Sequence, residues 1–120
     1  MLKMVLADKQ AIFRAGIAKV LGVEDEIRIV AQVQSGDQLV PTLEKFHPHV
    51  LAFSTGLISN VAEIVEAATT YKTRLIALAE TGENTGTYLG AGIHGVVFRS
   101  VTGPQLLEYA FHSAGGGPQF

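Results

Sequence analysis

The sequence predicts an α/β fold, a doubly wound parallel sheet in which five strands alternate with five helices. Three apolar runs, at residues 4–7, 50–53 and 75–79, are continuous rather than alternating. Continuous apolar runs are typical of strands that are buried on both faces of a parallel sheet. Segments with apolar residues at helical spacing lie between the runs, and this alternation favours crossover connections in a single doubly wound sheet.

The remaining elements follow in chain order. The run at 27–33 contains Arg28 and Gln32, which suits a strand at a sheet edge, and residues 96–98 give the last strand. Segment 81–92, the expected fourth helix, contains four glycines, each costing about 1 kcal/mol relative to alanine, so we expect it to be short or frayed. The apolar faces of the other helices are Ile12, Phe13, Gly16, Ile17, Val20 and Leu21; Leu39, Leu43 and Phe46; Val61, Ile64, Val65 and Ala68; and Leu106, Leu107, Ala110 and Phe111.

Length and composition limit the classes of protein. The 120 residues carry a net charge of −2 and include no cysteine, which excludes disulfides and thiolate chemistry and argues against direct nucleic-acid binding. No apolar stretch reaches the roughly 18 residues that a membrane helix needs, and the N-terminus lacks a signal-peptide pattern. We expect a cytoplasmic protein without membrane contact, with one domain over residues 1–114 and a linker or disordered terminus at 115–120.

Five residues fall at or just past the ends of predicted strands: Asp8, Lys9, Ser54, Ala79 and Arg99. In an open parallel sheet the carboxyl ends of the strands form the edge where ligands bind. The sequence therefore predicts a pocket at this edge.

Two other patterns are less informative. His47 and His49 lie two residues apart, but two histidines without a third ligand make a weak metal site, so we expect a solvated loop there. Residues 90–95 match the dinucleotide-binding glycine pattern, yet they follow a helical segment and enter a strand. The pattern requires the opposite order, so these are interpreted as turn glycines.

The pocket residues lie in segments that resemble receiver domains of bacterial two-component response regulators. VLADKQAIFRAGI at 5–17 is similar to the first strand and helix of that family, PHVLAFS at 48–54 to its third strand, and GIHGVVFR at 92–99 to its fifth. Arg14 and Gly16 match the LuxR/NarL-type subfamily. The resemblance covers essentially the whole chain and implies a (βα)5 flavodoxin-like fold with strand order 2-1-3-4-5.

The resemblance also places the functional positions of the family, and most of them are changed. The phosphoacceptor aspartate falls on Ser54, the acidic pair on Asp8 and Lys9, the switch Ser/Thr on Ala79, the switch aromatic on Val96 and the terminal lysine on Arg99.

These changes remove the usual reaction. Phosphoryl transfer to a receiver needs a carboxylate nucleophile and Mg²⁺, but here one acid, Asp8, stands beside the ammonium group of Lys9. Ser54 is a poor nucleophile without an adjacent base, and Ala79 cannot donate a hydrogen bond. We expect a pseudo-receiver that is not an enzyme, binds Mg²⁺ weakly or not at all, and pairs Asp8 with Lys9 and Arg99, with Glu80 nearby.

The resemblance implies signal transduction, with control of transcription or another output by protein contact. A LuxR-type helix-turn-helix domain would follow residues 115–118 in a longer parent protein. A homodimer is expected, and the weak fourth helix favours the first and fifth helices as its interface, with contacts at Ile12, Leu106, Tyr109 and Ala110. The alternatives are a sensor for a small anionic ligand, held by Lys9, Arg99 and Ser54, and a stand-alone protein-interaction module.

Overall fold

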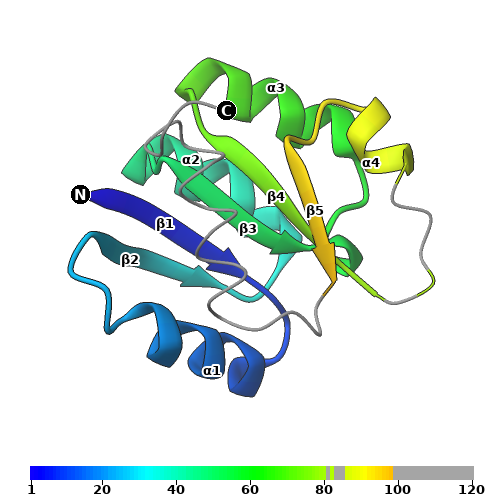
Figure 1. Cartoon of the computed structure of the whole chain (residues 1–120). Helices are drawn as coiled ribbons and strands as arrows, with labels where there is room; N and C mark the ends of the chain where they lie inside the picture. Colours follow the sequence, from blue (N-terminus) through cyan, green and yellow to red (C-terminus); the bar gives the residue numbers. More distant parts are fainter. Residues whose placement is uncertain (81, 83–85, 99–120) are drawn as a thin grey trace.

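The computed structural model describes residues 1–80, 82 and 86–98, which form a five-stranded parallel sheet flanked by helices (Figure 1). The sheet order β2-β1-β3-β4-β5 confirms the predicted fold class and topology. Arg99, the expected fifth helix with Leu106, Tyr109 and Ala110, and the glycine-rich segment 115–120 lie outside the described residues. The strands are β1 (Leu2–Ala7), β2 (Ile27–Val33), β3 (Val50–Ser54), β4 (Arg74–Ala79) and β5 (Gly95–Phe98); the helices are α1 (Ala11–Leu21), α2 (Leu39–Phe46), α3 (Val61–Tyr71) and α4 (Gly86–Gly90).

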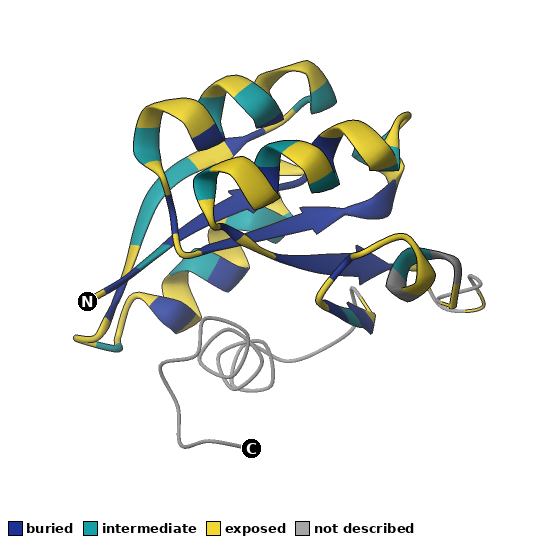
Figure 2. Ribbon diagram, turned by 90° about the horizontal axis from the view of Figure 1, so that it is seen from above, coloured by how far each residue is buried: buried dark blue, intermediate teal, exposed yellow. Residues whose placement is uncertain are grey.

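The central strands explain the continuous apolar runs. Every residue of β3 is buried, because successive side chains point to opposite faces and both faces are covered. Leu51 and Phe53 pack in a core with residues of α2 and α3, whereas Val50 and Ala52 pack in a second core with residues of α1. Figure 2 shows this arrangement, with the dark blue strands between the two helical layers.

Strand β2 lies at one end of the sheet, as its mixed composition predicts. Its pairing with β1 shifts after Met4, which pairs with Ile29, because the next residue, Val5, pairs with Ala31. Val30 is therefore the extra residue of a bulge. Ile29 packs on the α1 side of the sheet, whereas Ala31 packs on the side of α2 and α3.

Helix α4 spans only five residues, which confirms the short helix expected from the glycines. The chain then turns at Gly92, whose φ of +104° lies in the region that favours glycine. A Cβ atom there would also meet Val65 Cγ1 at 3.1 Å. Within the described residues, no helix is long and apolar enough to cross a membrane.

The histidines before β3 are exposed and lie in the connection between α2 and β3, which agrees with the expectation of a solvated loop. The ring of His47 also stacks on Tyr71 with 5.2 Å between centroids, and Nδ1 of His49 accepts a hydrogen bond from the backbone N–H of Lys3 at 2.8 Å. The sequence did not predict these contacts, because they join residues far apart in the chain. Both histidines therefore help to hold the amino edge of the sheet together.

Candidate functional site

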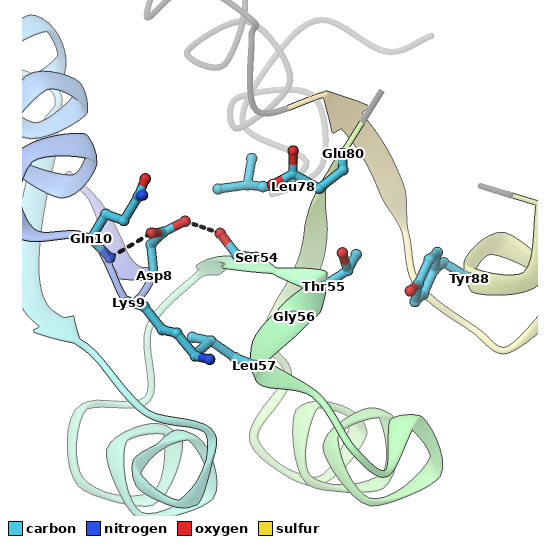
Figure 3. Close-up of a pocket in the computed structure, with 10 residues that line it drawn as sticks. All are labelled: Asp8, Lys9, Gln10, Ser54, Thr55, Gly56, Leu57, Leu78, Glu80 and Tyr88. Carbon is cyan, nitrogen blue, oxygen red and sulfur yellow. Dashed lines mark hydrogen bonds between the residues drawn. The ribbon is translucent and has the colours of Figure 1, made fainter. Parts of the chain in front are cut away.

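The carboxyl edge of the sheet brings Asp8 and Ser54 together, as the sequence predicts. Asp8 follows β1 directly, and Ser54 is the last residue of β3, which pairs with β1 in register. A cavity of about 540 Å³ opens at this edge (Figure 3). Its lining consists of Asp8, Lys9, Gln10, Ser54, Thr55, Gly56, Leu57, Leu78, Glu80 and Tyr88.

Asp8 is a buried and firmly held carboxylate, with only 3% of its surface exposed. Its Oδ1 accepts a hydrogen bond from the backbone N–H of Gln10 at 2.8 Å, and its Oδ2 accepts one from the hydroxyl of Ser54. The guanidinium group of Arg14 donates to the backbone carbonyl of Asp8. Hydrogen bonds of this kind offset the cost of removing a charge from water.

Ser54 has a definite structural role at the end of β3. The side chain is 7% exposed and donates its hydroxyl proton to Asp8. Sequence reasoning missed this bond because the two residues are 46 positions apart. The parallel ladder alone brings them together.

The expected ion pair between Asp8 and Lys9 is not formed, and that prediction is wrong. Figure 3 shows the Lys9 side chain running past Leu57, away from the Asp8 carboxylate. The chain bends at Lys9 as it leaves β1, so the alternation of a strand does not set the direction of this side chain. Arg99, the other expected partner, lies outside the described residues.

At the end of β4, Leu78 and Glu80 line the cavity, with the buried Ala79 between them. Val96 is half-buried in β5, pairs with Ala77 and packs in the core on the side of α2 and α3. Sequence reasoning assigned no role in the pocket to several lining residues, namely Thr55, Gly56, Leu57 and Tyr88. All but Tyr88 closely follow the end of β3, so their positions were a usable signal.

The described residues offer few ligands for a Mg²⁺ ion at this edge. Mg²⁺ requires oxygen ligands in near-octahedral geometry, and the carboxylates that line the cavity are those of Asp8 and Glu80. Both oxygens of Asp8 also accept a hydrogen bond from the protein. Among the residues that the structure describes, no group of three or more histidine or acidic side chains is placed to hold a metal ion.

Comparison with known proteins points to one family of folds. No protein-family model matches the chain. The transcriptional regulatory protein DegU of Brevibacillus brevis is 21% identical over 121 residues, which cover 97% of this chain and 51% of DegU. The chain thus spans about half the length of this curated relative.

Solved structures resemble the chain over nearly its whole length. The signal receiver domain of the response regulator NarL from Mycobacterium tuberculosis superposes with a TM-score of 0.85 at 18% identity. The match covers 97% of this chain and 98% of the receiver-domain chain. The isolated REC domain of RcsB from Salmonella enterica serovar Typhimurium gives 0.79 at 18% identity, with 99% and 91% covered. The chain therefore has the fold of response-regulator receiver domains.

Proposed function

We propose that this chain is an atypical receiver domain that works in signal transduction without phosphorylation. The observation that carries the proposal is the hydrogen bond from Ser54 to Asp8, at the position where the resemblance places the phosphoacceptor. The fold shared with NarL and RcsB and the match to DegU support the general class.

The residues at this edge argue against the usual chemistry. An acyl phosphate forms on a carboxylate, so the hydroxyl of Ser54 cannot form the phosphorylated species of a receiver. The described residues also offer no histidine at the cavity to activate the serine. We infer that the domain is not an enzyme and that Mg²⁺ plays no part in its signalling.

The output is proposed to be regulation by protein contact, with transcription as its target. DegU is a transcriptional regulatory protein of about twice this length, which supports a longer parent with a LuxR-type helix-turn-helix domain after residue 114. With a net charge of −2, the present domain is not expected to bind nucleic acid itself. The 88% exposed Ile12 on α1 supports a homodimer that uses this helix.

The test is a pair of amide NMR spectra, recorded with and without Mg²⁺ and beryllofluoride. This phosphoryl mimic is the one with which the RcsB receiver domain was solved. We expect no shift at Asp8, Ser54 or Thr55. Specific shifts that spread from Ser54 to α4 and β5 would show that phosphorylation chemistry survives.

A second candidate function is a small-molecule sensor. The cavity of about 540 Å³ has the size of typical ligand sites, and its lining combines the apolar Leu57 and Leu78 with polar groups. A ligand screen by thermal shift, followed by NMR mapping, tests this candidate. A compound that stabilises the domain and shifts the amides of Thr55 and Tyr88 supports it; stabilising compounds that leave these amides unchanged contradict it.

A further inference from the structure

Two histidines use the same ring atom to hold the start of a neighbouring strand. Nδ1 of His94 accepts a hydrogen bond from the backbone N–H of Leu75 at 2.9 Å, just as His49 does from Lys3. The histidines directly precede β5 and β3, so they lie at the amino edge of the sheet, opposite the cavity. Because Nδ1 accepts a hydrogen bond only when it carries no proton, the contact with Leu75 requires the neutral Nε2–H tautomer of His94.

Protonation of the His94 ring removes this hydrogen bond. A charged imidazolium donates from both nitrogens, so the protonated Nδ1 of His94 would face the N–H of Leu75 as a second donor. The hydrogen bond is then lost. The His94 side chain is exposed, so it can take up a proton from solvent without a prior opening of the fold.

The surrounding charges set when this happens. Three cations lie on or beside the segments that contact the two rings, namely Lys3 in β1, Arg74 in β4 and Lys72 after α3. Helix α3, whose Val65 lies beside Gly92, carries the exposed Glu63 and Glu66. Burial and, secondarily, the charge of Arg74 lower the pKa of His94 below its ordinary value of 6.5. The ring therefore takes up its proton at a lower pH than an unperturbed histidine does.

The two histidines differ in how firmly the strand that follows each one is otherwise attached to the sheet. Strand β3 pairs with β1 on one side and β4 on the other, whereas β5 stands at the end of the described sheet and pairs with β4. Strand β5 has only four residues. The loss of one hydrogen bond at its start therefore removes a larger share of its attachment than the same loss would remove from β3.

We propose that His94 is a proton-operated latch on β5. The neutral ring adds a hydrogen bond between β4 and the start of β5, beside the backbone bond of 3.1 Å from the N–H of His94 to the carbonyl of Leu75, and protonation removes the ring's contribution. Because β5 is so short, the loss extends to Val97, which pairs with Leu78 in the wall of the cavity. The effect of protonating His94 at the amino edge of the sheet thus reaches the cavity at the carboxyl edge. This response goes beyond the proposed signalling function.

Asparagine provides a direct test, because its Oδ1 can accept the bond from Leu75 but does not titrate. Hydrogen-exchange protection factors are measured by NMR at neutral pH and at an acid pH well below 6.5, in the wild type, His94→Asn and His94→Ala. In the wild type, the protection of Leu75 and Val97 is expected to fall about fivefold in acid, the factor that an ordinary hydrogen bond contributes. His94→Asn keeps high protection at both pH values, and His94→Ala shows low protection at both.

His49→Asn is the matched control at the other histidine. It should leave the acid response of Leu75 and Val97 unchanged. The proposal is overturned by an equal acid response in His94→Asn, by no response in the wild type, or by long-range ¹H–¹⁵N spectra that place the neutral ring's proton on Nδ1 of His94.

Discussion

The Ser54 hydroxyl donates a hydrogen bond to the Asp8 carboxylate, and this bond ties the end of β3 to the end of β1. Both residues are buried, so the bond forms where water is scarce and a missing partner is costly. The same two positions decide both the stability of this edge and its chemistry. Two predictions follow from substitutions at Ser54.

Replacing Ser54 with alanine should lower the free energy of unfolding by about 1–3 kcal/mol, because a buried carboxylate loses one of its donors. Urea denaturation measures the difference. Ser59→Ala changes an exposed serine nearby and should stay within about 0.5 kcal/mol of the wild type. Equal effects of the two substitutions would show that the Asp8–Ser54 bond contributes nothing.

Replacing Ser54 with aspartate places a second carboxylate against Asp8. Without metal, the unfolding free energy should fall by about 3 kcal/mol, because a second negative charge is placed in a buried site beside Asp8. Millimolar Mg²⁺ should restore much of this loss, since paired carboxylates are ligands that Mg²⁺ prefers.

The wild type and the neutral variant Ser54→Asn are the controls for the metal effect. Neither should gain stability from Mg²⁺ in the same denaturation experiment. A wild-type gain as large as that of Ser54→Asp would contradict the view that this edge has lost its metal site.

Gly36 and Gly16 should respond to alanine with opposite signs. A Cβ atom on Gly36 would lie 2.1 Å from the carbonyl oxygen of Leu57, so Gly36→Ala should cost about 1–3 kcal/mol of unfolding free energy. Gly16 lies within α1 with no atom near its added Cβ, and Gly16→Ala should gain about 0.5–1 kcal/mol. Thermal and urea unfolding check both predictions. An unchanged unfolding free energy in Gly36→Ala would show that the segments around Gly36 and Leu57 do not pack this tightly.

Stability should depend on pH through His94. Its pKa is lower in the folded chain than the ordinary 6.5, so the unfolded chain binds more protons between these two values. The free energy of unfolding therefore rises with pH across this window. The contribution of His94 is complete above pH 6.5 and is lost as the pH falls through the lower pKa of the folded chain. A urea series from neutral to acid pH should show the wild type losing stability relative to His94→Asn, and parallel curves would rule out this linkage.

Ile12→Asp should convert the proposed homodimer into a monomer without unfolding it. Ile12 is 88% exposed, so the substitution affects an interface rather than the core. Sedimentation equilibrium measures the association, and Thr70→Asp, an exposed change on α3, is the control. A dimer that persists in Ile12→Asp would exclude α1 as its interface.

The sequence predicted what depends on burial and strand order. The continuous runs of β3 and β4 mark buried strands, Arg28 and Gln32 mark an edge, and the strand ends bring Asp8 beside Ser54. Contacts between side chains and distant backbone could not be predicted in the same way. The bond from Lys3 to His49 spans 46 positions, and only the finished sheet brings its two ends together.

The direction of the Lys9 side chain did not follow from alternation along a strand, because Lys9 lies in a bend after β1. The bulge at Val30 was not predictable either, because an extra residue in one strand is defined only by its pairing with the other.

That bulge bears on how copies of this protein meet. An exposed sheet edge with regular backbone spacing is a template on which a strand of another molecule can add. Strand β2 interrupts that spacing at Val30 and carries the exposed Arg28 and Gln32 on either side. Aggregation by strand addition is therefore discouraged at the β2 edge, and association there is left to helical surfaces.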